Sequence, residues 1–331
     1  MTGPPGLQEA RAATRAGIIT PRRKAVFFAS MIALGLVLPF FVYPVFLMNV
    51  LVMALFASAF NLLLGYTGLL SFGHAAFLGS AAYVTGLVVK IWGLPPEVGI
   101  LAGTAFATLL GWAIGSLAIR RSGIYFAMIT LGFAQMIYFV VVQLPWTGGE
   151  DGLQGIPRGS LLGLLPLKGN YAMYYVVYAV FLGGFFVVYR AIHSPFGHVL
   201  RAIRENEPRA LSLGYDVDRY KVIAFVISAG LAGLAGSTKA LVLQFAALTD
   251  VHWHRSGEVV LMTLLGGMGT VVGPSVGALV VVSLENYLSG VGSWVTVITG
   301  AVFVVCVLAF RRGIVGEGLA LLKRFSTGVK R

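Results

Sequence analysis

Few residues of this chain could do chemistry, and most of those lie inside or beside long apolar segments. Lys239 and Glu258 are the main ionisable residues within such segments, and Glu285 lies near the end of one. Charged side chains are costly in lipid, so they usually face a cavity or a partner of opposite charge. Lys239 and Glu258 could therefore neutralise one another across adjacent helices. These residues are weak evidence for a proton relay, because a relay needs a chain of buried carboxylates.

The patterns that mark other chemistries are missing. The sequence contains no Gly-x-x-x-x-Gly-Lys-Ser/Thr, no His-Glu-x-x-His and no Cys-x-x-Cys, so it has no phosphate loop for ATP and no common zinc motif. Its single cysteine, Cys306, excludes an intrachain disulfide. His252 and His254 could pair on a metal, but Trp253 between them is typical of a lipid boundary. We expect no metal, no cofactor and no catalytic residue in this chain.

The composition indicates a membrane protein. Hydrophobic residues make up 58% of the 331 residues and charged residues 11%, whereas a soluble domain carries about 25% charge. The 43 glycines stand largely inside apolar runs, which suits helices that approach closely in a membrane. About 20 apolar residues cross the hydrocarbon layer. The runs of suitable length are 25–47, 48–66, 74–92, 97–119, 123–143, 170–190, 220–245, 257–289 and 294–310.

The expected fold class is therefore all-α, a polytopic membrane helix bundle with roughly 8–10 transmembrane segments. A stripe of small residues in the run 97–119 recurs every fourth residue, which predicts a close helix partner. These residues are Gly99, Gly103, Ala107, Gly111 and Gly115. The run 25–47 follows basic residues but is too long for a signal peptide, so we expect it to be retained as a span.

The net charge of +12 is concentrated in a few polar segments. Basic residues gather before the first run, at Arg120 and Arg121, in residues 190–221 and after Phe310. The positive-inside rule assigns all of these segments to the cytoplasm. We expect a basic cytoplasmic segment at 1–24, a membrane domain at 25–310 and a basic cytoplasmic tail at 311–331. A nucleic-acid partner is not expected, because no folded basic face with interleaved aromatic residues is present.

The number of crossings between cytoplasmic segments must be even, and this requirement locates an interruption. The runs before residue 221 satisfy it, but an odd number of runs follows. The run 257–289 must therefore break, and GGMGTVVGPSVG at 266–277 is the obvious place, because Gly and Pro interrupt a helix. It forms either two short crossings, giving roughly ten spans, or a re-entrant hairpin, giving roughly eight.

A second interruption, GYTGLLSFGH at 65–74, lies in the first half of the chain. One glycine-interrupted hydrophobic segment in each half is a pointer to a translocation path, although glycines also permit tight helix crossing without lining a path. The path candidates are the polar and glycine residues of these segments and the buried charges: Asn61, Gly65, Gly68, Ser71, His74, Lys239, Glu258, Gly266, Gly267 and Gly269. The outward loop 144–169 is long, and it is either a lid or docking surface or a solvated linker.

The polar loop 191–219 between two apolar runs carries its own helix signals. Ser194, Pro195 and Gly197 are expected to end the preceding helix, and residues 198–206 form an amphipathic turn. Pro208 suits the start of a short helix, with Asn206 or Glu207 as its cap and Gly214 just past its end. A helix of under two turns is unstable alone in water. The bundle and a partner protein must therefore hold residues 208–213.

Together, these segments resemble the permease subunits of ATP-binding-cassette importers for branched-chain amino acids. The resemblance is carried by NLLLGYTGLLSFGHAAFLGSAAYVTG at 61–86, SPFGHVLRAIRENEPRALSLGYDVDRYKVIAFVISAGLAGLAG at 194–236 and LLGGMGTVVGPSVGALV at 264–280. It covers most of residues 60–290. Importers of the wider class share a coupling motif, Glu-Ala-Ala-x-x-x-Gly. Ala210 and Gly214 match its second Ala and its Gly, whereas Pro208 and Arg209 replace its Glu and first Ala.

The resemblance implies a complex in a bacterial plasma (inner) membrane, with both termini of this chain in the cytoplasm. Its other members would be a second homologous permease, two cytoplasmic ATPases that hold ATP and magnesium, and an external solute-binding protein. The short helix would couple the ATPases to the bundle. The coupling residues expected on this basis are Arg201, Arg204, Glu205, Glu207, Pro208, Arg209, Ala210 and Gly214. Urea, short amides or small aromatic acids are alternative cargoes, and a secondary carrier or a membrane enzyme would be a different class of protein.

Overall fold

The computed structural model describes residues 30–161, 163, 165–167, 169–288, 290, 294–309 and 313–318. The chain divides into two compact units, Met1–Pro44 and Val45–Arg331, and each is described by itself. In the first, residues 30–37 form a helix that continues into η1 (Leu38–Phe40). The predicted basic segment at 1–24 lies outside the described residues, as does most of the predicted tail at 311–331.

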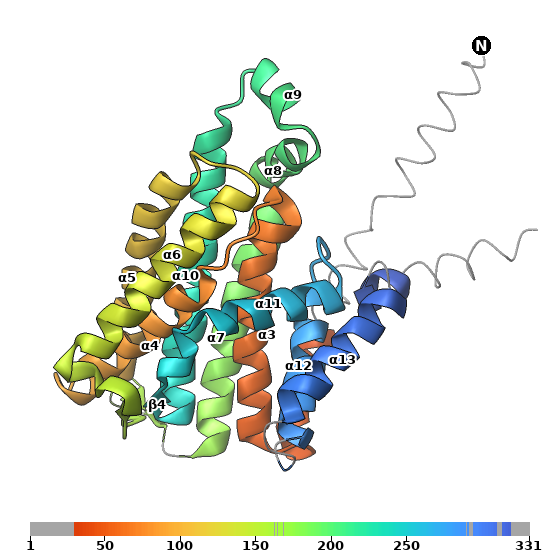
Figure 1. Ribbon diagram of the computed structural model, residues 1–331. Coiled ribbons are helices and arrows are strands. Elements are labelled where there is room, and N and C mark those ends of the chain that lie inside the picture. The colour runs from red at the N-terminus through yellow and green to blue at the C-terminus, as the bar shows by residue number, and fades with distance from the viewer. Residues whose placement is uncertain are drawn as a thin grey trace, which may run out of the picture. The chain divides into compact units, whose positions relative to one another are not determined.

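The second unit is built almost wholly from helices, which confirms the predicted all-α class (Figure 1). The longer helices are α3 (Pro44–Thr67), α4 (His74–Lys90), α5 (Pro96–Ala118), α6 (Ile124–Gln143), α7 (Asn170–Ile192), α10 (Val217–Leu243), α11 (Trp253–Gly266), α12 (Gly273–Leu288) and α13 (Trp294–Ala309). By length and composition α3, α5, α6, α7 and α10 could each cross a membrane. These features establish a multi-pass membrane protein.

Glycine and alanine allow α10 to pack closely against α4 and α5. A Cβ on Gly236 would lie 1.9 Å from the carbonyl oxygen of Leu78, and a Cβ on Gly233 would lie 2.3 Å from the Cβ of Ala107. The small-residue stripe of α5 is buried along its length, which confirms that it faces a close partner helix. Small residues at such crossings let backbones approach and gain dispersion energy.

Two of the helices begin inside the bundle. After α3, residues 68–73 run without helix toward the interior, and α4 starts there at His74. After α10, the chain passes through β4 (Phe245–Ala246) and η4 (Leu248–Asp250) before α11 starts at Trp253. The two starts are adjacent, because the backbone N–H of Ala75 donates to the hydroxyl oxygen of Ser256 at 2.9 Å. From this meeting point α4 runs toward the end of the unit that holds β4, whereas α11 runs across the bundle toward α12 (Figure 1).

The predicted break in the run 257–289 is present between α11 and α12. Its turn, residues 267–272, lies beside Gly65 and Arg204, at the end of the bundle where α8 (Pro195–Glu205) and α9 (Glu207–Ser212) stand (Figure 1). α10 ends at the other end of the bundle, so the chain passes between the two ends before the turn and again after it. This arrangement supports two short crossings rather than a hairpin that re-enters from one side.

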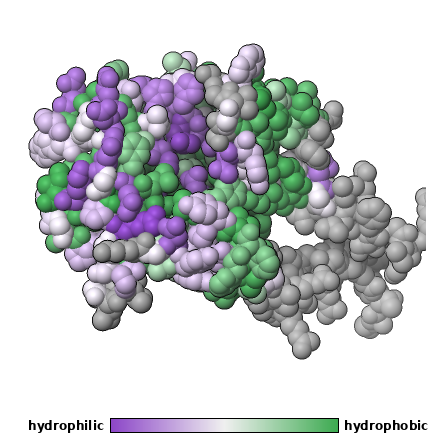
Figure 2. All heavy atoms as spheres, turned by 90° about the horizontal axis from the view of Figure 1, so that it is seen from below, coloured by the Kyte–Doolittle hydropathy of each residue, from purple (hydrophilic) through white to green (hydrophobic). Residues whose placement is uncertain are grey.

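The other end of the unit holds the long loop 144–169 and the only strands among the described residues. β1 (Leu153–Gln154) pairs antiparallel with β4, and β2 (Ser160–Leu161) pairs with β3 (Leu165–Pro166). The loop also contains η2 (Pro145–Thr147) and η3 (Gly149–Asp151). Viewed from this end, hydrophilic residues gather over the strands and apolar residues cover the side of α12 and α13 (Figure 2). The loop is therefore a folded cap tied to α10 through β4.

Replacing Gly236 by alanine is expected to destabilise the bundle. The new methyl group would overlap the carbonyl oxygen of Leu78 on α4, and overpacking of this kind costs about 1–3 kcal/mol. The thermal unfolding temperature of the detergent-solubilised protein should fall by several degrees. The matched control is Gly132→Ala on α6, where a Cβ meets nothing within 4 Å. Equal unfolding temperatures for the two variants would contradict the close packing of α10.

Candidate functional site

The two glycine-interrupted segments, which are about 200 residues apart in sequence, meet at one place through Asn61. The Asn61 side chain, only 1% exposed, donates from Nδ2 to the carbonyl oxygen of Thr270 at 2.8 Å. Its Oδ1 accepts from the backbone N–H of Gly269 at 2.9 Å. Each buried hydrogen bond contributes about 1 kcal/mol, and losing its partner costs more. One asparagine on α3 therefore fixes the turn between α11 and α12.

We call this contact the glycine junction, defined by residues 61–68 and 266–273. The hydroxyl of Tyr66 donates to the carbonyl oxygen of Gly269 at 2.9 Å. A Cβ on Gly65 would lie 2.2 Å from Asn61 Oδ1 and 2.8 Å from the backbone nitrogen of Gly269. Gly269 itself has φ +77°, which favours glycine. Glycine is required at 65 because the α3 backbone touches the turn directly.

Within the turn, Gly266, Gly273 and Gly277 provide the close approach of α11 to α12. A Cβ on Gly266 would lie 1.8 Å from the carbonyl oxygen of Gly273, and one on Gly277 would lie 1.8 Å from that of Met262. Gly267 has φ +121°, a conformation that side chains rarely adopt. Packing and turn geometry thus explain these glycines in the described residues, and a path role for them remains a prediction.

Ser71 and His74 lie in the protein core. Both are fully buried, and the His74 ring packs edge-on against Phe60, Phe77 and Phe225. Its Nε2 lies 2.8 Å from the hydroxyl of Ser228, which itself donates to the carbonyl oxygen of Ala59 at 2.5 Å. The hydroxyl oxygen must then accept from Nε2–H. In this structure His74 links α3, α4 and α10 and does not line an open path.

A second group of polar residues forms a charge cluster where α11 begins. Lys239 pairs with Asp250 at 2.5 Å, and Arg255 lies 3.4 Å from the same carboxylate. Arg255 also forms an ion pair with Glu258 one turn further along α11. The expected direct pair between Lys239 and Glu258 is therefore wrong. Asp250 and Arg255, which were not singled out from the sequence, lie between the two residues in the network.

Sequence reasoning missed Asp250 and Arg255 because both fall in the gap between the apolar runs 220–245 and 257–289. From the sequence, this gap is predicted to be a loop outside the membrane. In the structure it returns into the bundle, and Asp250 is only 2% exposed. One signal in the sequence could have revealed them. An acid and a base flank an aromatic segment, and this segment follows an apolar run that contains a lysine. His252, in contrast, takes a local role, since its side chain accepts from the backbone N–H of His254 at the start of α11.

The short helix of the polar loop is present as α9, one residue earlier than predicted. Asn206 caps it by accepting from the backbone N–H of Arg209 at 3.0 Å, and Gly214 has φ +86° after its end. Glu207 pairs with Lys221 of α10 at 2.6 Å. The prediction for Ser194, Pro195 and Gly197 was wrong. α7 already ends at Ile192, and Pro195 begins α8 because its fixed φ suits a first helical position.

The predicted coupling residues divide into an inner and an outer set. Arg204 donates to the carbonyl oxygen of Gly65, and the Arg201 guanidinium lies 5.9 Å from the ring centre of Tyr66, so both reach the glycine junction. Ala210 is buried against Ile203 and Val217, with Val199 and Tyr220 around them. The outer set is exposed and consists of Glu205, Pro208, Arg209 and Gly214, together with the apolar residues Leu211 and Leu213.

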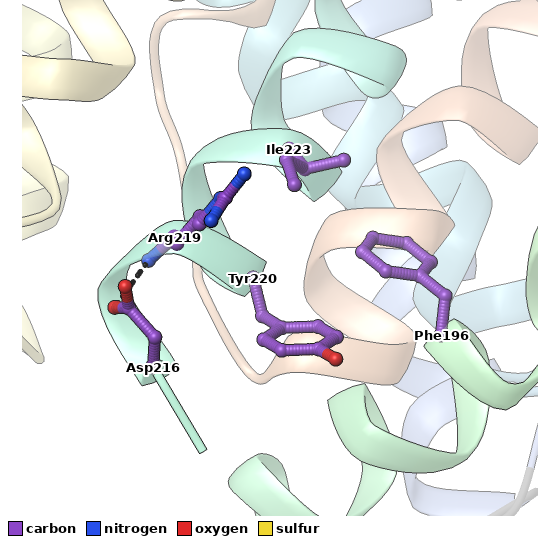
Figure 3. A pocket seen from close by; sticks show the side chains of 5 residues that line it. All are labelled: Phe196, Asp216, Arg219, Tyr220 and Ile223. Carbon is purple, nitrogen blue, oxygen red and sulfur yellow. Dashed lines mark hydrogen bonds between the residues drawn. The ribbon is translucent and has the colours of Figure 1, made fainter.

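A pocket of about 370 Å³ lies beside the outer set, at the start of α10 (Figure 3). It is lined by Phe196 of α8 and by Asp216, Arg219, Tyr220 and Ile223. The rings of Phe196 and Tyr220 are stacked with centroids 5.8 Å apart, and Asp216 caps α10 by accepting from the backbone N–H of Arg219 at 3.2 Å. The exposed loop thus presents both charged and apolar groups to the solvent.

Comparison with known families decides what kind of protein carries this arrangement. The family described as "Branched-chain amino acid transport system / permease component" matches residues 44–309, which is most of the chain. The chain belongs to this family. The matched region contains the glycine junction, the charge cluster and the loop with α8 and α9. A member of this permease family is a membrane component of a transport system and not an enzyme.

Its relatives differ in the cargo that their names state. The permease is 29% identical to the high-affinity branched-chain amino acid transport system permease protein LivM of Escherichia coli over 238 residues, 63% of this chain and 55% of that protein. It is 28% identical to the ribose import permease protein RbsC of Bacillus subtilis over 306 residues, 86% of this chain and 90% of that protein. The chain spans little more than half the length of the bacterial LivM relatives. No solved structure matches it.

Replacing Asn61 by leucine is expected to release the turn of the permease. Leucine has a similar volume but can neither donate to Thr270 nor accept from Gly269. Amide hydrogen exchange in residues 267–272 should become about ten-fold faster or more, because each lost buried bond is worth about 1 kcal/mol. Asn49→Leu on the same helix is the control, since Asn49 Oδ1 has no partner among the described residues. Unchanged exchange in the Asn61 variant would contradict the clamp.

Proposed function

We propose that this chain is the transmembrane permease subunit of an ATP-binding-cassette importer for branched-chain amino acids. It would lie in a bacterial plasma membrane with both termini in the cytoplasm, and a second homologous permease would complete the path. Two separate ATPase subunits would hold ATP and magnesium, and an external solute-binding protein would deliver the cargo. The family match over residues 44–309 and the lack of a phosphate loop in the sequence support this division of labour.

The observation that carries the proposal is the two-sided contact of the polar loop. On its inner side Arg204 bonds to the α3 backbone at Gly65, and the Tyr66 beside Arg201 bonds to Gly269. On its outer side Arg209, Leu211 and Leu213 are exposed. Apolar groups on an exposed loop tip fit a protein partner. Movement of an ATPase against this tip would reach both interrupted segments through the arginines.

Ala210 has a different role in this scheme from the one expected for a contact residue. Its side chain faces Ile203 and Val217 inside the loop, so it would hold α9 in place rather than touch the ATPase. Glu207 would act in the same way through its pair with Lys221, whose side chain is 4% exposed. The direct contacts would then come from Glu205, Pro208 and Arg209 and from the exposed leucines that follow them.

A sugar is the second candidate cargo, and a specific observation favours it. The ribose permease relative is covered over 90% of its length, whereas the LivM relative of Escherichia coli is covered over 55%. Urea, short amides and small aromatic acids stay open as further cargoes of the same architecture. A secondary carrier, the alternative from another class, would leave the two-sided polar loop without a purpose.

Co-purification tests the architecture, and ligand binding tests the cargo. An ATPase subunit and a second permease should follow the tagged chain out of membranes, and reconstituted complexes should take up leucine when the cognate binding protein and ATP are present. If no ATPase follows the chain, the importer assignment fails. If the binding protein takes ribose and not leucine, the architecture stands and the amino-acid cargo is overturned.

Arg204→Gln is expected to uncouple transport from ATP hydrolysis. The amide keeps a polar side chain but loses the charged donor that reaches Gly65. Coupling energies of about 1–3 kcal/mol correspond to roughly five- to 150-fold effects, so leucine uptake should fall by about ten-fold or more while basal ATP hydrolysis persists. Arg120→Gln, on the exposed turn after α5, is the matched control. Equal loss of uptake and of basal hydrolysis would point to misfolding and contradict the coupling role.

A further inference from the structure

The turn between α5 and α6 carries two positive charges that no carboxylate pairs with. Arg120 and Arg121 are exposed, and neither side chain forms a hydrogen bond or an ion pair with the residues that the structure describes. No acidic residue lies between Glu97 and Glu150 in the sequence. The positive-inside rule assigns this turn to the cytoplasmic border of the membrane. Two guanidinium groups at this border are therefore available to an anionic partner.

A hollow of about 650 Å³ opens beside this turn, and it is lined by Arg121, Tyr125, Met128 and Ile129. Its volume falls in the range of roughly 300–1,000 Å³ that is typical of ligand sites. Tyr125 and Met128 are 68% and 62% exposed. The three residues of α6 lie three and four positions apart, so they share one face of the helix. The hollow therefore combines one arginine with an exposed and largely apolar helix face.

The groups that line the hollow change from charged to apolar along the chain. Arg121 precedes α6, Tyr125 stands on its first turn, and Met128 and Ile129 lie about one turn further into the span at about 1.5 Å per residue. A guanidinium binds phosphate through two parallel donors. Tyrosine places an apolar ring and a hydroxyl at the boundary between water and lipid. A phospholipid presents its phosphate, its glycerol esters and its acyl chains in the same order.

The opposite face of α6 is fixed to the bundle. Phe126 is buried and packs against Phe225 of α10, with ring centroids 6.0 Å apart. The hydroxyl oxygen of Thr130, which is also buried, accepts from the backbone N–H of Phe72 at 3.2 Å. Phe72 belongs to the non-helical residues 68–73 of the first interrupted segment. The first turns of α6 therefore support this segment on their inner side and form the hollow on their outer side.

The position and charge of the hollow favour a lipid over a protein partner. Met128 and Ile129 belong to a helix that is long and apolar enough to cross a membrane, so a partner confined to the cytoplasm would not reach them. A second homologous permease would obey the same positive-inside rule and bring basic rather than acidic groups to this border. An anionic phospholipid meets both conditions, because it carries a negative charge at the border and apolar chains below it.

We propose that Arg121 and the α6 face beside it bind an anionic phospholipid of the cytoplasmic leaflet. The phosphate pairs with the Arg121 guanidinium, and an acyl chain lies along Met128 and Ile129. Anionic lipids of that leaflet attract basic residues near the surface, and basic pockets beside membrane helices bind their headgroups. The bound lipid would steady the helix that supports Phe72. This inference goes beyond the proposed function, since it depends on neither the cargo nor the ATPases.

The test is photo-crosslinking of the complete complex in phosphatidylcholine nanodiscs that contain a little phosphatidylglycerol with a diazirine in its acyl chain. Mass spectrometry should find the label on residues 124–143, and unlabelled phosphatidylglycerol should displace it where added phosphatidylcholine does not. Arg121→Gln should lower the labelling about five-fold or more, because a basic residue at an anionic surface contributes about 1 kcal/mol. Equal labelling by a phosphatidylcholine probe with the same diazirine would overturn the proposal.

Two further variants separate a defined site from general charge attraction and from misfolding. Arg120→Gln is the matched control, because Arg120 stands on the same turn but is not among the described residues that line the hollow. It should lower the labelling by less than about two-fold, and Arg121→Lys should keep most of it. An equal loss in the Arg120 and Arg121 variants shows diffuse attraction, and a loss in Arg121→Lys as large as in Arg121→Gln shows a structural role. Either result overturns the inference, as does unchanged labelling of Arg121→Gln or the absence of label from residues 124–143 of the unaltered complex.

Discussion

Backbone that leaves a helix inside an apolar bundle must find hydrogen-bond partners in the protein, because lipid offers none. This constraint shapes both interrupted segments. At the turn between α11 and α12, Asn61 and Tyr66 satisfy the N–H and C=O of Gly269 and the C=O of Thr270. At the start of α4, the hydroxyl of Ser256 accepts from Ala75. These side chains thus supply hydrogen bonds at places where helices stop or start.

The same constraint explains why glycine is concentrated at these places. A turn that relies on an asparagine from another helix needs that helix at backbone contact, and only glycine at position 65 allows it. Where α10 crosses α4, Gly236 has the same effect. Close approach then yields dispersion energy over the long contact of α10 with α4 and α5. This packing matters because the hydrophobic effect does not drive helices together in lipid, whose tails are as apolar as the side chains. The stability of the bundle and the geometry of the interrupted segments thus both depend on glycine.

The sequence predicted what depends on local chemistry and on counting. Run lengths and charge gave the helical class, the need for even crossings gave the break after Gly266, and turn chemistry gave the Asn206 cap of α9 and Gly214 after it. It failed where a partner lies far away in the chain. The sequence alone does not indicate that Asn61 contacts Gly269, or that Lys239 pairs with Asp250 instead of Glu258. Both depend on how a loop returns into the bundle, which periodicity does not record.

α11 connects the two candidate regions. Its first turns carry Arg255 and Glu258 of the charge cluster, and its last residue, Gly266, lies in the glycine junction that Arg204 touches. The helix has 14 residues and contains no proline, so it spans about 20 Å at about 1.5 Å per residue without a built-in kink. A shift of the junction cannot leave the cluster in place unless α11 bends or its first turn unwinds. Gly257, beside Glu258, is the one glycine in the interior of α11, and glycine weakens a helix there. The charge cluster and the polar loop are therefore mechanically linked through a single short helix, even though they lie far apart in the bundle.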